Sequence, residues 1–338
     1  MFRLRSAVVI GLTAALAGCP FQDKLESFSG PTQGSTYTVK YVSNGETSKD
    51  QIRRQTEEIL EEIDRQMSTY RADSVVETFN DLPAGACMAV PDGVRELVLA
   101  GERLSKESEG AFDLTIEPLL NLWGFGPKGA GEHVPTAEQI AATKKNVGYR
   151  HLRIEGDQLC KDAAVEVDFN SIAAGYSVDA VAAHLKKSGI DSYLVEITGE
   201  LAAAGRKPDG SPWRIAIEAP HDNERVAQRI IELEGYGVST SGDYRNFFEE
   251  NGKRYSHTFD PRRGAPIDHQ LAAVTVIDRS TLRADGLSTL LMVLGQDEGL
   301  AYAQAHNIAA FFVVREEQGF VSKSTKAFDE LFGAGAEK

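Results

Sequence analysis

The chain lacks the signatures of several large protein classes. It has three cysteines among 338 residues, and no Cys/His spacing typical of a zinc site. Neither a GxGxxG nor a Walker A motif occurs, which argues against Rossmann and P-loop nucleotide sites. The formal charge is −14, with no arginine-rich run or basic stripe. Because phosphate backbones are held by clustered Lys and Arg, this charge argues against a nucleic-acid partner.

The composition is that of a folded globular protein. Hydrophobic residues make up 42% and charged residues 25% of the chain, whose length suits one large domain or two ordinary ones. No internal repeat, low-complexity tract or membrane-spanning run follows the N-terminal segment. Strand and helix patterns are mixed without a strict βαβ rhythm, which favours the α+β class.

The first 19 residues have the pattern of an export signal. Arg3 and Arg5 precede an apolar stretch over residues 8–17, and small residues lead to Cys19. This pattern resembles a bacterial lipobox. The resemblance implies a signal peptide over residues 1–18, a lipidated Cys19, a tether over 19–34 and a folded domain over 35–334. Such a protein is held at the periplasmic side of a membrane, the inner membrane being favoured; the alternative is an ordinary signal peptide with an incidental Cys19.

The two remaining cysteines leave one structural question open. An exported chain folds in an oxidising compartment, where Cys87 and Cys160 can pair. A disulfide between them is a hypothesis, because the sequence does not test whether their Cα atoms lie within about 7 Å.

Hydrophobic periodicity predicts the order of the main elements. Helices are predicted from the capping residues Ser48, Asp92, Thr136 and Ser171, over 280–294 and near 299–306. Strands are predicted over the ranges 36–42, 164–167, 193–197, 213–217, 271–277 and 309–314. A Gly/Ser/Pro-containing tether is predicted over 27–34.

Three polar clusters lie within residues 239–289 and indicate an enzyme site. Asp285 and Thr289 are four residues apart in a helical pattern, so both oxygens face one point and suit Mg²⁺. On spacing alone, a satisfied Asp and a Thr bonded to its own helix are the better explanation. His257 can take a proton near neutral pH, although a lone histidine is more often structural. Thr240-Ser241-Gly242 offers hydroxyls for phosphate or a simple turn.

Taken in order, the motifs resemble those of the ApbE family, the bacterial FAD:protein FMN transferases. The resemblance covers nearly all of the chain after the signal. Its carriers are Gly34 to Tyr37, Ser68 to Tyr70, Phe79-Asn80, Gly110 to Asp113, Pro118 to Gly126, Asp168 to Asp179, Thr240 to Tyr244, Ser256-His257, Asp260-Pro261, and Ala284-Asp285 with Thr289.

The resemblance implies a single α+β domain of the T-fold-related type, with the active site in a cleft. It further implies an enzyme that cleaves FAD with Mg²⁺, releases AMP and esterifies FMN to a Thr or Ser hydroxyl of a target protein. Implied acceptors are periplasm-facing subunits of Na⁺-translocating NADH:quinone reductases, Rnf-type complexes or nitrous-oxide-related flavoproteins. Two alternatives remain open: an FAD pyrophosphatase on the same scaffold, and a flavin-binding or solute-binding lipoprotein without catalysis.

The resemblance also assigns roles to individual residues. Mg²⁺ is expected at Asp285, Thr289 and the backbone carbonyl of Ala173, with His257 as the base and Asp243 as a less secure catalytic residue. The residues expected at FAD are Gln33, Tyr70, Ala111, Phe112, Asp113, Asn170, Tyr176, Thr240, Ser241 and Phe259. The chain departs from the family pattern at Gln33, Ala174 and Arg263, which puts ring and phosphate contacts in doubt and leaves the metal set intact.

Overall fold

An open, fully antiparallel eight-stranded sheet forms the centre of the molecule. The computed structural model describes residues 24–129, 131–218, 227–243 and 246–333. Across the sheet, the strands follow in the order β1 (Lys24–Thr32), β2 (Ser35–Ser43), β6 (Tyr193–Ile197), β7 (Glu200–Ala204), β10 (Tyr236–Gly242), β15 (Leu271–Asp278), β16 (Ala309–Glu316) and β17 (Gly319–Ser324). Strands from both ends of the chain therefore meet in one sheet.

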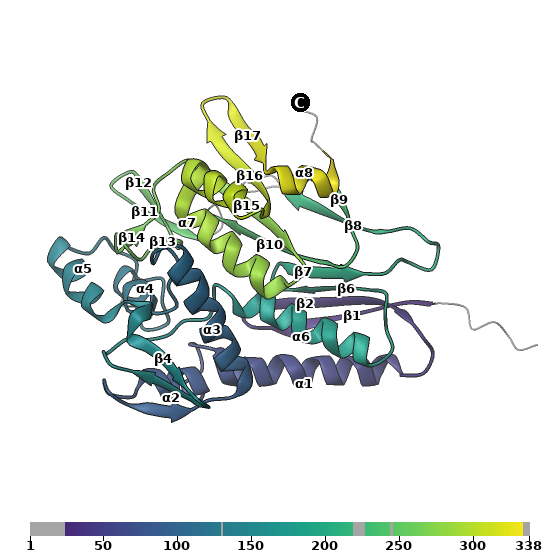
Figure 1. Ribbon diagram of the computed structural model, residues 1–338, viewed down its shortest axis with the longest axis horizontal. Coiled ribbons are helices and arrows are strands. Elements are labelled where there is room, and N and C mark those ends of the chain that lie inside the picture. The colour runs from purple at the N-terminus through teal and green to yellow at the C-terminus, as the bar shows by residue number, and fades with distance from the viewer. Residues whose placement is uncertain (1–23, 130, 219–226, 244–245, 334–338) are drawn as a thin grey trace, which may run out of the picture.

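Long helices cover one face of this sheet (Figure 1). They are α1 (Lys49–Met67), α6 (Ala173–Lys187) and α7 (Thr281–Ala305), while α3 (Asp92–Glu107) packs against α1 and α7. α1 begins at Ser48, whose side chain accepts the backbone N–H of Gln51, as the sequence predicts for an N-cap. Its buried stripe of Ile52, Leu60 and Ile63 recurs at helical spacing and packs toward the core.

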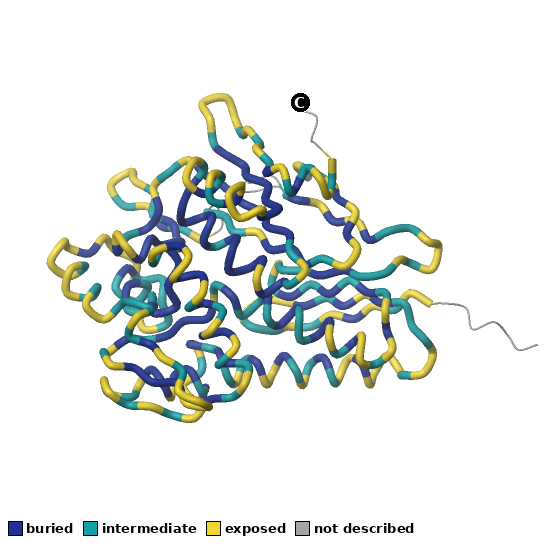
Figure 2. Tube along the Cα trace, viewed as in Figure 1, coloured by how far each residue is buried: buried dark blue, intermediate teal, exposed yellow. Residues whose placement is uncertain are grey.

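A smaller layer covers part of the opposite face. It consists of a hairpin of β8 (Trp213–Glu218) with β9 (Ala227–Leu233), together with α8 (Lys326–Phe332). Trp213, Ile215 and Phe328 pack there against β15 and β16 residues such as Phe311. In Figure 2, buried residues lie along α7 and along the middle strands of the sheet.

The remaining elements gather at one end of the sheet, at the lower left of Figure 1. They are α2 (Val75–Asn80), β3 (Cys87–Ala89), α4 (Glu117–Trp123), α5 (Ala137–Thr143), two short 3₁₀ helices (Lys144–Asn146 and Tyr149–His151), β4 (Leu152–Glu155) and β5 (Gln158–Lys161). Two small hairpins adjoin them: β11 (Phe247–Glu250) with β12 (Lys253–Ser256), and β13 (Phe259–Asp260) with β14 (Ala265–Pro266).

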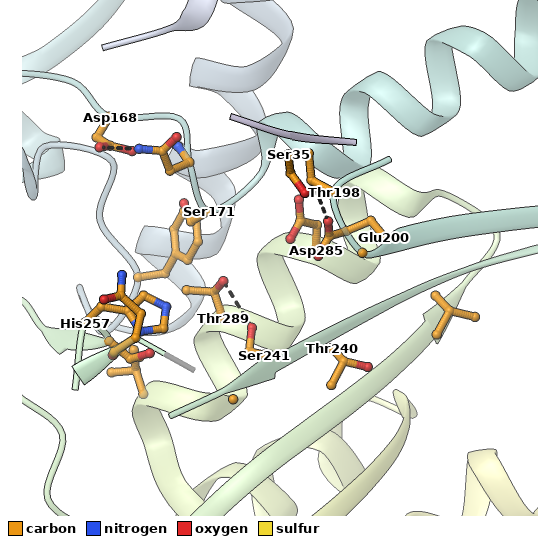
Figure 3. A pocket seen from close by; sticks show the side chains of 18 of the residues that line it. Ser35, Asp168, Ser171, Thr198, Glu200, Thr240, Ser241, His257, Asp285 and Thr289 are labelled. Atoms are coloured by element: carbon orange, nitrogen blue, oxygen red, sulfur yellow. Dashed lines mark hydrogen bonds between the residues drawn. The ribbon is translucent and has the colours of Figure 1, made fainter. Parts of the chain in front are cut away.

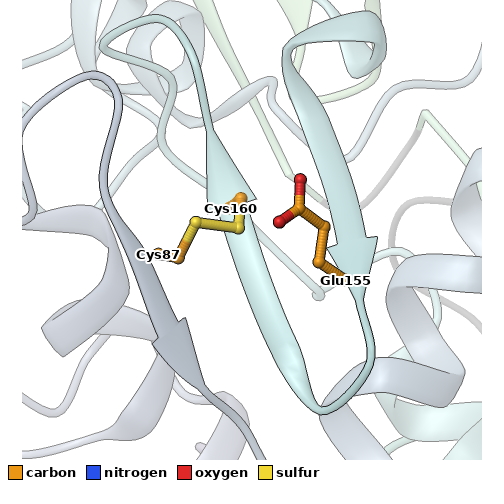
Figure 4. A group of neighbouring side chains, drawn as sticks. All are labelled: Cys87, Glu155 and Cys160. Atoms are coloured by element: carbon orange, nitrogen blue, oxygen red, sulfur yellow. A yellow bond between two sulfur atoms is a disulfide. The ribbon is translucent and has the colours of Figure 1, made fainter.

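Cys87 and Cys160 form a disulfide, which confirms the hypothesis drawn from the exported sequence. They are register partners of β3 and β5, with a Cα–Cα distance of 4.0 Å. Figure 4 shows Glu155 of β4 beside them. The two sulfurs are bonded to each other, so this group offers no thiolate to a metal.

Removing this disulfide is expected to lower the free energy of unfolding by about 4 kcal/mol, because the crosslink closes a loop of 73 residues. Urea denaturation of the Cys87→Ala/Cys160→Ala variant measures the loss. Reduced wild type, unfolded in the same way, is the control for the cavity that alanine leaves at buried Cys160. A change below about 1 kcal/mol in both would contradict the expectation.

The strand predicted over 164–167 does not form, because a side chain takes the place of a strand partner. Asn80 Nδ2 donates to the carbonyl of Val167 at 3.0 Å, and Asn80 Oδ1 accepts the Val167 N–H at 2.7 Å. The segment is thus extended but pairs with no strand. It leads into α6, which begins at Ala173 rather than at the predicted Ser171.

One further prediction needs correction. Residues expected in the tether form β1 at Lys24–Thr32, paired along its length with β2. The two predicted C-terminal helices are confirmed, because α7 consists of two helical segments that meet at Gly295, whose φ of 80° and ψ of −173° lie outside the helical region. The predictions for residues 1–23, including Cys19, lie outside the described part. Within that part, no helix combines the length and apolarity of a membrane span.

Candidate active site

One large cleft brings together segments from both halves of the chain. Its volume is about 820 Å³, within the range of sites that enclose a whole cofactor. The residues proposed from the sequence that line it are Tyr70, Ala111, Phe112, Asp113, Asn170, Thr240, Ser241, His257, Phe259, Asp285 and Thr289. Figure 3 shows His257 at one side of this cleft and Asp285 at the other, with Ser241 and Thr289 between them.

An apolar and aromatic wall forms the first side of the cleft. Tyr70 follows the end of α1 and is 68% exposed, which is unusual for a large ring that lines a cavity. Ala111 and Phe112 line the same cleft and are themselves buried. Phe259 joins them from β13 and packs edge-on against Phe125, at 5.8 Å between ring centroids. Such a surface suits a flat aromatic ligand.

Asp113 lines the cleft, but its oxygens are already engaged. Its Oδ1 accepts the N–H and the hydroxyl of Thr115, and its Oδ2 accepts the N–H of Tyr149 at 2.8 Å. Burial nevertheless raises the pKa of this carboxyl above its ordinary value. The residue therefore fixes the loop that carries Phe112 and has little hydrogen-bonding capacity left for a ligand.

Asp168 plays a similar part beneath Asn170. The Asp168 carboxylate accepts the N–H of Asn170 at 2.6 Å and its side-chain Nδ2 at 2.9 Å. Full burial raises the pKa of Asp168 to about 6, against the lowering effect of these hydrogen bonds. Asn170 itself is exposed in the cleft, so its amide oxygen remains available to a ligand.

Oxygen donors crowd the opposite side, where β10 faces α7. Ser241 Oγ lies 2.9 Å from Ser288 Oγ and 3.5 Å from Thr289 Oγ1. Ser239, two residues earlier on the same face of β10, lies 3.2 Å from Asp285 Oδ1. Asp285 and Thr289 both open onto the cleft one helical turn apart, as their spacing predicts.

The Asp285 carboxylate is buried and only partly neutralised. Its Oδ2 accepts the backbone N–H of Gly175 at 2.8 Å, while its Oδ1 has only the shared Ser239 hydroxyl. Burial, followed by the nearby charge of Glu200, raises the pKa of Asp285 well above its ordinary value. A bound cation would stabilise the ionised form of the Asp285 carboxylate. Carboxylate and hydroxyl oxygens are ligands that Mg²⁺ prefers. The donor set therefore fits such an ion.

His257 is held in one orientation between β12 and β13. Its Nδ1 lies 3.0 Å from the carbonyl oxygen of Asn246, an acceptor, so Nδ1 carries the proton in the neutral ring. The free lone pair is then on Nε2. Burial lowers the pKa of His257 below its ordinary value, which favours the neutral, proton-accepting form.

Four assigned residues do not reach the cleft lining. Asp243 is engaged by Arg315, whose Nη1 and Nη2 donate to its two oxygens at 2.8 and 2.6 Å. The structure thus pairs Asp243 with Arg315, and its catalytic role stays a prediction. Gln33 donates instead to Ser177 Oγ at 2.8 Å.

The other two residues lie at the start of α6. Tyr176 packs beside Gly93 at the start of α3, outside the cleft lining. Ala173 opens the helix, and its carbonyl accepts the Ser177 hydroxyl at 2.8 Å. Ala173 is linked to Asp285 through Gly175, two residues later in α6, whose N–H donates to Asp285 Oδ2.

Sequence reasoning missed part of the lining. Thr198, Gly199 and Glu200 reach the cleft from the turn between β6 and β7, and Ile215 and Ile217 reach it from β8. The Thr-Gly pair between two alternating runs is a short hairpin signal that would have marked this turn. No comparable local signal marks the two isoleucines, because their alternation is that of any half-buried strand.

Comparison with known proteins identifies the family of the chain. Residues 33–312 match the ApbE family. The chain is 43% identical to the FAD:protein FMN transferase of Vibrio cholerae, covering 95% of this chain and 97% of that one, and 40% identical to that of Haemophilus influenzae, covering 98% and 99%.

Solved structures show the same fold. The apo flavinyl transferase ApbE of Pseudomonas stutzeri has a TM-score of 0.88 and 67% identity, over 94% of this chain and 99% of that one. The ApbE protein of Thermotoga maritima has a TM-score of 0.82 and 26% identity, over 91% and 99%. The fold expected from the sequence, one mixed helix-and-sheet domain, is thereby confirmed.

Proposed function

The chain belongs to the ApbE family, and we propose that it transfers FMN from FAD to a Thr or Ser hydroxyl of an acceptor protein, with Mg²⁺ as the metal. One observation carries the proposal: an aromatic wall, a cluster of hard oxygen ligands and an oriented histidine line the same cleft. The names of the similar proteins support the flavin chemistry.

In the proposed reaction, the acceptor oxygen attacks the phosphorus of the FMN half. The bond from that phosphorus to the bridging oxygen breaks, and AMP leaves with the electron pair. His257 Nε2 accepts the acceptor's proton, because Nδ1 is committed to the Asn246 carbonyl. The product is a phosphoester between FMN and the acceptor.

Asp285 and Thr289 would hold the metal ion with their side-chain oxygens. When bound, the ion supplies positive charge against the phosphate oxygens, which is usually the dominant contribution in phosphoryl transfer. Ser239 and Ser288 position these ligands by hydrogen bonds around Asp285. The position of Ala173 at the start of α6 keeps its carbonyl among the proposed ligands, although Ser177 Oγ already donates to it.

Tyr70 is expected to stack on the isoalloxazine ring. Tyr70→Ala should weaken FAD binding by about tenfold or more, since a ring stacked on an aromatic side chain contributes about 1–3 kcal/mol. Tyr70→Phe is the matched control and should retain affinity, because phenylalanine keeps the aromatic ring that stacks on the flavin. Quenching of flavin fluorescence measures both; equal affinities for wild type and Tyr70→Ala would remove Tyr70 from the site.

We also propose that Cys19 anchors the domain at the periplasmic side of the inner membrane. Four residues separate Cys19 from the start of β1 at Lys24, and this short link limits the reach between the two Cα atoms to about 17 Å. An acceptor in the same membrane would then meet the cleft close to the bilayer. Proposed acceptors are periplasm-facing subunits of Na⁺-translocating NADH:quinone reductases, Rnf-type complexes or nitrous-oxide-related flavoproteins.

Mass spectrometry of a co-expressed acceptor tests the function directly. The expected result is an added FMN on one Thr or Ser of the acceptor, dependent on FAD and Mg²⁺. Release of free FMN and AMP without labelling of any acceptor would instead indicate an FAD pyrophosphatase. Binding of FAD without turnover would indicate a flavin carrier.

A further inference from the structure

Glu200 lines the cleft beside Asp285, on the side proposed to bind the cation. It is the first residue of β7 and follows the two-residue turn of Thr198 and Gly199. In register, Glu200 pairs with Ile197 of β6, so both side chains lie on the sheet face that α6 and α7 cover. Figure 3 shows Glu200 beside Asp285, with Thr198 bonded to it.

The turn fixes one oxygen of the Glu200 carboxylate. Thr198 has a φ of 55°, a region that β-branched residues rarely adopt, and Gly199 follows with a φ of 122°. The Thr198 N–H donates to the carbonyl of Thr36 at 3.0 Å, which holds the turn against β2. The Thr198 hydroxyl donates to Glu200 Oε2 at 3.0 Å. The carboxylate plane is thereby set before any ligand arrives.

The second oxygen of Glu200, Oε1, and Oδ1 of Asp285 compete for the same hydrogen-bond donor, the Ser239 hydroxyl. Ser239 Oγ lies 3.4 Å from Glu200 Oε1 and 3.2 Å from Asp285 Oδ1. A hydroxyl has one proton to donate, so it satisfies one of these two oxygens at a time. The two carboxylates share one hydrogen-bond donor and repel each other. A cation bound beside them would therefore be favoured.

Glu200 is placed to assist a cation without ligating it. Oε2 is committed to Thr198, and the Ser239 hydroxyl bridges Oε1 and Asp285. Mg²⁺ usually keeps several of its waters when a protein supplies only one or two carboxylates. Those waters need hydrogen-bond acceptors. Mutation of the residues that accept these hydrogen bonds typically weakens metal affinity by about 10- to 100-fold.

We propose that Glu200 is a positioning residue of the metal centre, whose Oε1 accepts hydrogen bonds from water bound to the cation at Asp285 and Thr289. Its negative charge also increases the affinity for that cation. The inference rests on the metal site of the proposed function. It extends that site to β7 and explains why a threonine is held in the left-handed region at this turn.

The test is the affinity of the full domain for Mn²⁺, measured by a titration that is monitored by electron paramagnetic resonance. This measurement requires no turnover. Glu200→Gln keeps the shape and removes the charge, and its dissociation constant should rise by about 10- to 100-fold. Thr198→Val, which loses only the hydroxyl contact, should give a smaller rise. Glu234→Gln is the matched control, because Glu234 is exposed, pairs with Arg206 and does not line the cleft; its affinity should stay within about twofold of wild type.

Transfer kinetics separate a positioning role from a general structural one. For Glu200→Gln, the Mg²⁺ concentration at half-maximal rate should rise while kcat at saturating Mg²⁺ recovers toward wild type. An unchanged Mn²⁺ affinity in Glu200→Gln and Thr198→Val would overturn the inference, as would a lost kcat that excess metal does not restore. If Asp285→Asn also leaves Mn²⁺ binding unchanged, the proposed metal site itself is wrong, so the two failures are distinguishable.

Discussion

Replacing Asp285 with asparagine is expected to lower the rate of FMN transfer by about 10³-fold while the fold is kept. Asparagine retains an oxygen for the Gly175 N–H, which Asp285 Oδ2 accepts at 2.8 Å. The amide NH₂ group then replaces Oδ1. This group is a hydrogen-bond donor and does not bind a cation. Phosphate charge would thus go uncompensated in the transition state. Steady-state transfer to a purified acceptor measures the loss.

Flavin binding separates this effect from a damaged fold. The flavin contacts are expected from Tyr70, Phe112 and Phe259 and not from Asp285, so FAD affinity measured without metal should change little in Asp285→Asn. Asp268→Asn is the matched control: it makes the same charge change at an exposed residue paired with Arg263, outside the cleft. Transfer within about tenfold of wild type in Asp285→Asn would argue against metal-assisted chemistry at this site.

Local patterns in the sequence predicted the elements that local forces determine. The helix after Ser48 and the helix after Thr136 begin as predicted, because each cap residue bonds to a backbone N–H three residues on. The extended segment before Asp168 was misread as a strand for a related reason. Its pattern is that of a buried strand, but its partner is the side chain of Asn80, 87 residues earlier in the chain.

The site was predictable only in part, since its members are distant in sequence. Spacing placed Asp285 and Thr289 on one helix face, whereas only the family resemblance connected them with Tyr70 and Phe112. The ion pair of Asp243 with Arg315 was not predicted, because the two residues lie 72 positions apart in the chain. Such a pair forms through the strand order of the sheet, which the periodicity of each strand does not specify.

Replacing His257 with alanine is expected to lower the transfer rate by about 10²- to 10⁴-fold with little change in FAD affinity, the usual range for a general base. The ring is held by Asn246 with Nε2 as the proton acceptor, and alanine removes that acceptor. His306→Ala is the control, since His306 is exposed at the end of α7 and contacts Tyr302 instead of the cleft. Its transfer rate should match wild type.

The pH dependence of transfer tests the role of His257 more sharply than the loss of rate alone. A base acts only when neutral, so wild-type kcat should fall as the pH drops through the pKa of His257. Burial lowers that pKa, so the fall should lie below the ordinary histidine value of about 6.5. His257→Ala should lose this acid limb and keep a low, flat rate there. An unchanged limb in the variant would assign the titration, and the proton transfer, to another group.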